Sequence, residues 1–177
     1  MSEQIRVLLS EEELDRKIAE LGERISKDYE GESVHLICIL KGSIFFTCEL
    51  AKRITVPVTI DFMCVSSYGS GTVSSGRVKI IKDLDENIEG KHVLIAEDIV
   101  DSGNTLSTLI KILQVRKPAS IRLCTLLDKP ERRVVDIKAD YSCFEIPDKF
   151  VVGYGLDYNQ HYRNLPYVGV VELDEEK

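Results

Sequence analysis

Long apolar runs are absent from this chain. No stretch approaches the roughly 18 consecutive apolar residues that a membrane-spanning helix needs. The first residues, MSEQIRVLLSEEELDRK, become acidic where a signal peptide would be apolar. We therefore expect a cytoplasmic protein with no membrane partner.

Basic residues are scarce relative to acidic ones. Lysine and arginine number 23 against 30 aspartates and glutamates, which gives a formal net charge of −7. No basic cluster is longer than Arg132-Arg133. Net negative charge disfavours a broad grip on a polyanion, so we expect no nucleic-acid partner. Any phosphate that the chain binds must be held locally.

Residues that commonly bind metals through sulfur or imidazole are few and scattered. The cysteines are odd in number and show no C-x-x-C spacing, and no two histidines lie within motif distance. We expect reduced cysteines packed in the core and no zinc site. These residues are Cys38, Cys48, Cys64, Cys124 and Cys143, and His35, His92 and His161.

The remaining composition is that of a soluble globular protein. The 177 residues are 44% hydrophobic and 30% charged, which excludes disordered, collagen-like and coiled-coil classes. This length suits one domain that buries about two-thirds of its unfolded surface. We expect a single domain over 1–177, with no internal repeat and no linker.

The hydrophobic pattern predicts an α/β fold. Ser10 and Glu13 match a capping box, and apolar residues then recur at helical spacing, so we expect a helix over 11–28. Two more helical stretches are expected, one ending at Leu50 and one over 105–115. Expected strands cover 34–40, 56–65, 78–81, 92–96, 121–127, 141–146, 150–154 and 168–171. This alternation favours a central, mostly parallel sheet flanked by helices, which binds ligands at the carboxyl ends of its strands.

One stretch has a loop composition. Residues 66–76, SSYGSGTVSSG, are nearly all serine, glycine and threonine. Such residues are too small and polar to pack and allow many backbone conformations. We expect a mobile loop there.

The segment 93–106, VLIAEDIVDSGNTL, carries the strongest chemical signal. A buried strand delivers Glu97 and Asp98 to its carboxyl end, and the turn 102–105 opens a helix whose first N–H groups have no helical partners. These N–H groups and the helix dipole suit a dianionic phosphate, and Gly103 lets the backbone approach it. Carboxylates beside a phosphate need hydroxyl groups or a cation, and a sugar phosphate with Mg²⁺ supplies both.

Simpler interpretations exist for the same segment. Asp101 and Ser102 could merely cap a helix, and any single acid could end a strand without binding anything. Three acids within five positions at the end of an apolar strand nevertheless need solvation or a partner.

Other known phosphate-binding motifs do not match this sequence. The nearest approach to a Walker A loop, at 71–76, lacks the lysine and the Ser/Thr, and Asp98 and Asp101 are not spaced as the D-x-D of aspartyl-phosphate enzymes.

The segment resembles the phosphoribosyl diphosphate (PRPP) signature of type I phosphoribosyltransferases, specifically of their hypoxanthine-guanine branch. Other segments resemble further parts of that family in the expected order, from about 34 to 171. They are Leu40-Lys41-Gly42 for the diphosphate loop, Ser67-Tyr68 for the flexible catalytic loop, Leu126 to Lys129 for the purine-recognition lysine, and Glu145 to Arg163 for the base-binding hood. In one departure, Asn104 stands where some members carry lysine, which leaves open how much side-chain charge holds the 5′-phosphate.

The resemblance implies a fold and a reaction. The fold would be that of type I phosphoribosyltransferases, with a small hood built from about 145–177 and the N-terminal segment. The reaction would be the Mg²⁺-dependent transfer of the phosphoribosyl group from PRPP to hypoxanthine and guanine in purine salvage, giving IMP or GMP and diphosphate. A homodimer or homotetramer is implied as well. The preference among hypoxanthine, guanine and xanthine stays open.

The resemblance also implies a role for each matching residue. Glu97 and Asp98 would hold the ribose hydroxyls and Mg²⁺, with Asp157 as a second metal ligand, and Asp101 would be the general base or acid at purine N7. The remaining assignments are Asp101, Ser102, Gly103, Asn104 and Thr105 for the 5′-phosphate; Lys41, Gly42 and Arg163 for the diphosphate; Ser67 and Tyr68 for the covering loop; and Lys129, Phe150, Val151 and Asp157 for the purine.

Each assignment has a plain alternative. Lys41 and Lys129 could be surface lysines, Phe150 could be core, and Asp157 with Arg163 could form a structural ion pair. Their joint order along the chain favours the functional interpretation. A second class, a nucleotide-sensing regulator of the same fold that binds RNA or DNA, should show a basic patch. Activity with PRPP, Mg²⁺ and hypoxanthine would distinguish the two classes.

Overall fold

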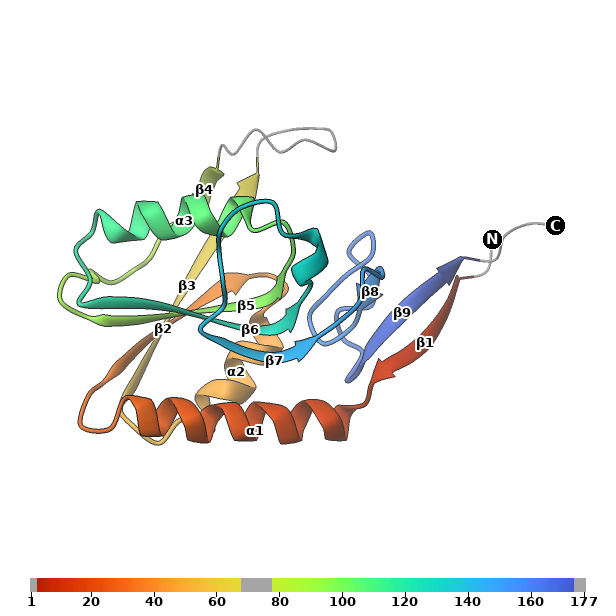
Figure 1. The fold of residues 1–177 in the computed structure, drawn as a ribbon, viewed down its shortest axis with the longest axis horizontal. Coiled ribbons are helices and arrows are strands. Elements are labelled where there is room, and N and C mark those ends of the chain that lie inside the picture. The colour runs from red at the N-terminus through yellow and green to blue at the C-terminus, as the bar shows by residue number, and fades with distance from the viewer. Residues whose placement is uncertain (1–2, 68–77, 174–177) are drawn as a thin grey trace.

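A six-stranded sheet forms the centre of the computed structural model, which describes residues 3–67 and 78–173 (Figure 1). The strand order is β4-β3-β2-β5-β6-β7, and every neighbouring pair except β3 and β4 is parallel. The strands are β2 (Val34–Leu40), β3 (Val58–Ser67), β4 (Val78–Lys82), β5 (His92–Val100), β6 (Ser120–Asp128) and β7 (Tyr141–Glu145). The expected fold class, a mostly parallel sheet flanked by helices, is confirmed.

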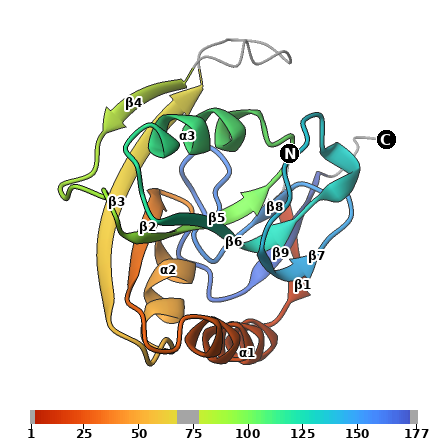
Figure 2. The same ribbon diagram turned by 60° about the vertical axis from the view of Figure 1, so that its left-hand side comes forward.

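Helices cover both faces of this sheet. The helices α1 (Glu11–Asp28) and α2 (Ile44–Ala51) lie on one face, and α3 (Asn104–Gln114) lies on the other (Figures 1 and 2). The predicted helix bounds at 11–28 are confirmed. The capping box is confirmed too, because Ser10 Oγ accepts the Glu13 N–H at 3.2 Å while Glu13 Oε2 accepts the Ser10 N–H at 2.8 Å.

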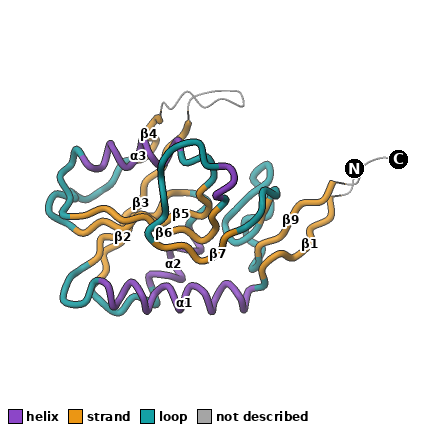
Figure 3. The backbone as a smooth tube through the Cα atoms, viewed as in Figure 1, coloured by secondary structure: helices purple, strands orange, loops and turns teal. Residues whose placement is uncertain are grey.

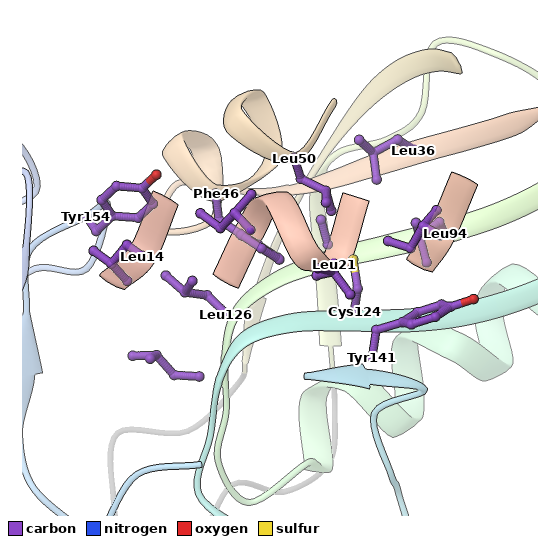
Figure 4. Packing of buried hydrophobic residues seen from close by; sticks show 14 of the residues in the cluster. Leu14, Leu21, Leu36, Phe46, Leu50, Leu94, Cys124, Leu126, Tyr141 and Tyr154 are labelled. Carbon is purple, nitrogen blue, oxygen red and sulfur yellow. The ribbon is translucent and has the colours of Figure 1, made fainter. Parts of the chain in front are cut away.

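The central strands are buried on both faces because their side chains alternate between two cores. Leu36 and Leu94 point into the cluster under α1 and α2, whereas Ile37 and Ile95 point into the cluster under α3. Figure 4 shows part of the first cluster, where Leu14 of α1 lies among residues of α2, the sheet and the C-terminal part of the chain. Burying each such leucine contributes about 2 kcal/mol. The two cores hold the sheet, and with it the strand ends, in a fixed position.

A second, three-stranded sheet lies beside the carboxyl ends of the main strands (Figure 3). Its order is β1-β9-β8, and it is antiparallel throughout. The strands are β1 (Glu3–Leu9), β8 (Val151–Val152) and β9 (Val168–Leu173). The sequence did not predict β1, which pairs with a strand more than 150 residues away.

Three local expectations were wrong. The expected strand 92–96 continues to Val100, so Glu97 and Asp98 lie within β5 and not at its end. The apolar run 150–154 yields only the two residues of β8. Cys48 is exposed on α2, whereas a position in the core was expected.

A buried carboxylate ties β3 to the turn that follows β4. Asp61 is 2% exposed and accepts the backbone N–H groups of Phe62, Asp85 and Glu86 at 2.7–3.2 Å. Burial alone would raise the pKa of Asp61, but these N–H donors hold it below its usual value.

None of the helices in the described residues is long and apolar enough to cross a membrane.

Candidate active site

A small cavity lies at the turn after β5. Gly103 precedes α3 with a φ of 83°, and a Cβ built there would lie 2.4 Å from Ile137 Cγ2, so the turn requires glycine. Asn104 begins α3, and its N–H is 3.4 Å from Ser102 Oγ. The cavity measures about 250 Å³ and is lined by Glu97, Asp101, Ser102, Gly103 and Thr105 together with Ile39, Val65, Ile99 and Leu106. Asp101, Ser102, Gly103 and Thr105, four of the five residues predicted to bind the 5′-phosphate, thus line one cavity at the N-terminus of α3, and Asn104 is not among its lining residues.

Two adjacent carboxylates, Glu97 and Asp98, lie in β5 shortly before this turn. Burial and the neighbouring Asp98 raise the pKa of Glu97 well above its usual range. Burial also raises the pKa of Asp98, although the Ile99 N–H donates to its carboxylate at 2.7 Å and Arg163 favours its charged form. Like charges at close range each stabilise the neutral form of the other, and a cation or a pair of hydroxyl donors relieves that cost. The pair is suited to hydroxyl groups with a divalent cation.

The loop after β2 approaches these acids closely. The Leu40–Lys41 peptide bond is cis. A Cβ added to the buried Gly42 would lie 1.7 Å from Asp98 Oδ2, and one added to Gly155 would lie 2.0 Å from the Gly42 carbonyl oxygen. Glycine is therefore required at both positions, and the Lys41-Gly42 backbone lies between β5 and the C-terminal part of the chain.

The turn containing residues 153–163 brings Arg163 to the same place. Arg163 Nη2 lies 2.9 Å from Asp157 Oδ1, and Arg163 Nη1 donates to the Gly155 carbonyl at 2.8 Å. Gln160 Oε1 lies 3.3 Å from both Lys41 Nζ and Arg163 Nη2. The structure therefore contains the Asp157–Arg163 ion pair that was the plain alternative for these two residues. Gln160 connects this pair to Lys41, the lysine predicted to bind the diphosphate.

The residues predicted to bind the purine lie beyond the ends of β6 and β7. Lys129 is 7% exposed and donates to the Lys149 carbonyl at 2.6 Å, so it is not a solvated surface lysine. Phe150 is 55% exposed, so it is not core, and its ring meets the Tyr158 ring edge-on with centroids 5.5 Å apart. Val151 is buried in β8. An exposed aromatic face beside a buried ammonium group suits a flat, polar heterocycle.

Two arginines that sequence reasoning did not assign to the site hold Asp101. Arg132 Nε donates to Asp101 Oδ1 at 2.7 Å, and Arg133 Nη1 donates to the Asp101 carbonyl at 3.2 Å. Arg133 also pairs with Asp128 at the end of β6. Both arginines follow Lys129 closely in sequence, and their adjacency was the only signal that could have drawn attention to them.

The predicted loop falls largely outside the described residues. Ser66 and Ser67 end β3, whereas Tyr68 and the rest of the stretch to residue 76 lie in the part that the structure does not describe. Among the described residues no group of three or more His, Cys, Asp or Glu is placed to hold a metal ion. Mg²⁺ is often held by one or two carboxylates and the substrate's own phosphates, so Glu97 and Asp98 still fit it.

Comparisons with known proteins agree on one family. A family model described as a phosphoribosyl transferase domain matches residues 7–159. The chain is 53% identical over 167 residues to the hypoxanthine-guanine phosphoribosyltransferase of Streptococcus thermophilus, covering 94% of this chain and 93% of that protein. It is 54% identical to the Bacillus subtilis protein of the same name, with the same coverage. A crystal structure of a hypoxanthine phosphoribosyltransferase from Staphylococcus aureus is similar with a TM-score of 0.92 at 53% identity, covering 94% of this chain and 91% of that one.

Proposed function

This chain belongs to the phosphoribosyltransferase family, and we propose how its described residues divide the reaction among them. The reaction is the transfer of the phosphoribosyl group from PRPP to hypoxanthine or guanine in purine salvage, which releases IMP or GMP and diphosphate. One observation supports the residue roles above all. The parallel strands β2, β5, β6 and β7 end at one edge of the sheet, where Lys41, Asp101, Lys129 and Phe150 follow them closely.

The sugar phosphate would bind over the end of β5. The 5′-phosphate enters the turn at 101–105, where backbone N–H groups and the hydroxyls of Ser102 and Thr105 donate to it. Asn104 adds no formal charge, so helix and backbone dipoles carry most of that interaction. Glu97 and Asp98 accept from the ribose hydroxyls, which places the anomeric carbon between the turn and the Lys41-Gly42 loop.

The diphosphate would lie against that loop. The close contact between Gly42 and Asp98 puts the loop's backbone beside the sugar site, and Lys41 and Arg163 bring positive charge to the leaving group. Bound Mg²⁺, held by Glu97 and Asp98 with Asp157 as a further ligand, would supply charge neutralisation to the leaving oxygens. Arg163 can exchange its contact with Asp157 for diphosphate oxygens.

The purine would bind between Lys129 and Phe150. Lys129 Nζ donates to the 6-oxo group, Phe150 stacks on the ring, and the Val151 backbone pairs with the ring edge. N9 of the purine forms a bond to the anomeric carbon, the C1′–O bond breaks, and diphosphate leaves with that electron pair. Asp101 takes the proton from N7.

A direct assay tests this proposal. The purified protein is mixed with PRPP, MgCl₂ and hypoxanthine, and IMP is measured by chromatography, with guanine and xanthine in parallel. Adenine serves as the matched control because it lacks the 6-oxo acceptor that Lys129 reads. We expect IMP and GMP to form and AMP to form far more slowly. Binding of IMP or GMP without any turnover of the bases would instead favour a nucleotide-sensing regulator. That the protein acts as a homodimer or homotetramer stays a prediction.

A further inference from the structure

The Asp101 carboxylate is held by a side chain from a different segment. Arg132 lies at the end of the short 3₁₀ turn Pro130–Arg132, and its Nε donates to Asp101 Oδ1 at 2.7 Å. The same guanidinium reaches a second carboxylate, because Arg132 Nη1 lies 3.2 Å from Asp148 Oδ2. Arg132 therefore bridges the turn after β5 and the segment between β7 and β8.

The second carboxylate continues the chain of contacts toward the purine site. Asp148 Oδ1 lies 3.8 Å from Lys129 Nζ, and the Lys149 carbonyl next to it accepts from the same ammonium at 2.6 Å. The groups assigned to purine N7 and to the 6-oxo group, Asp101 and Lys129, are thus linked through Arg132 and Asp148. This link joins two groups that would meet the same flat ring.

We propose that Arg132 is a positioning residue for the transfer, which orients the Asp101 carboxylate toward purine N7 while Asp148 fixes the guanidinium. This inference rests on the proposed function. The guanidinium carries several N–H donors in a rigid plane, so it can hold two carboxylates at a set distance and angle. A lysine at this position keeps the charge but presents one nitrogen on a flexible stem.

Because both side chains are partly exposed, Arg132 should act on Asp101 mainly by fixing its orientation and less through its charge. The side chains of Arg132 and Asp101 are 49% and 45% exposed, and ion pairs in such surroundings contribute at most about 1 kcal/mol. The backbone of the turn has its own anchor in Arg133, which binds the Asp101 carbonyl and pairs with Asp128. Loss of Arg132 should therefore free the Asp101 side chain while the turn keeps its shape.

The test compares turnover among variants of the full chain. Arg132→Gln should lower kcat about fivefold with little change in KM for PRPP, and Arg132→Lys should not restore it. Asp148→Ala should lower kcat in the wild-type background but add nothing to the kcat loss of Arg132→Gln, whereas its effect through the contact with Lys129 should appear in KM for hypoxanthine. The matched control is Arg116→Gln, which breaks a two-contact ion pair with Asp83 at 2.7 and 2.9 Å, remote from the site, and should leave kcat unchanged.

Four results would overturn the inference. They are a kcat of Arg132→Gln within twofold of wild type, full rescue by lysine, multiplicative losses in the double variant, and an equal loss in Arg116→Gln. Should Arg132→Gln fold poorly by its melting temperature, the Asp148→Ala variant alone decides, since an unchanged kcat there contradicts the bridge. Asp101→Asn in the same assay separates the proposed proton role of Asp101 from the proposed positioning role of Arg132. Normal turnover of Asp101→Asn would refute its proposed proton role, whereas a loss there with normal Arg132→Gln would refute the positioning role alone.

Discussion

Replacing Gly42 by alanine should damage the site while the fold stays intact. The new Cβ would lie 1.7 Å from Asp98 Oδ2, whereas ordinary contact begins at 3.4 Å, so the carboxylate or the loop must move by about 1.7 Å. The φ of Gly42 lies outside the left-handed region, and alanine therefore adds no backbone strain of its own. Misplacing groups around a reacting centre by about 1 Å can cost about 100-fold in rate. We expect kcat/KM for PRPP to fall about 100-fold, which corresponds to about 2.7 kcal/mol.

The assay is the initial rate of IMP formation at varied PRPP, with thermal unfolding measured on the same preparations. Gly31→Ala is the control, because Gly31 has a φ of 81° but nothing within 4 Å of a built Cβ. That variant should lose about 1 kcal/mol of unfolding free energy through backbone strain and keep wild-type kinetics. A kcat/KM of Gly42→Ala within threefold of wild type, or an equal loss of activity in Gly31→Ala, would contradict a role for the close approach of Gly42 to Asp98.

Three further predictions concern single side chains. Asp101→Asn should lower kcat by about 10²- to 10⁴-fold while PRPP binding, measured by calorimetry, stays near wild type; normal turnover would remove Asp101 from the proton step. Lys129→Ala should raise KM for hypoxanthine far more than KM for PRPP, and an unchanged ratio of hypoxanthine to adenine binding would contradict its role as the reader of the 6-oxo group. Asp61→Asn should reduce the unfolding free energy by about 3 kcal/mol in urea titrations, because the amide turns a donor toward backbone N–H groups. The pKa of Asp61 is lower in the folded protein than in the unfolded chain. The stability that the ionised Asp61 contributes is therefore present above about pH 4 and is lost as the pH falls below that value. The unfolding free energy of Asp61→Asn should consequently fall less than that of the wild type over the same acidic range.

The elements that could be predicted from the sequence are those whose signals are local. The helix at 11–28 has its capping box and its apolar stripe within one segment, and the central strands are recognisable because they are apolar on both faces. Strand β1 has no such signal. Its residues alternate only briefly and Val7 is 51% exposed, so what makes it a strand is the pairing of Ile5 with Val171, which no local pattern encodes.

The site divides in the same way. The acids of β5 and the turn at 101–105 lie in one continuous segment, and their chemistry could be inferred without knowing where other segments lie. The contact of Gly42 with Asp98 and the bridge from Arg132 to Asp148 join residues 56 and 16 positions apart. Such contacts depend on which strands end side by side. They can be predicted from the sequence only once the strand order is known.

The carboxylates and the cations of the candidate site lie on different kinds of structural element, and this difference bears on how the site would hold a substrate rich in negative charge. The two carboxylates that would meet the sugar come from β5, a strand buried between two neighbours, so their positions are fixed. The positive groups come from loops: Lys41 contacts Gln160, and Arg163 pairs with Asp157. In the proposed function a diphosphate would displace these partners, so its net affinity would be the difference between two sets of charge-assisted contacts. The exposed contact of Lys41 with Gln160 should cost little to break, whereas the half-buried pair of Arg163 with Asp157 should cost more.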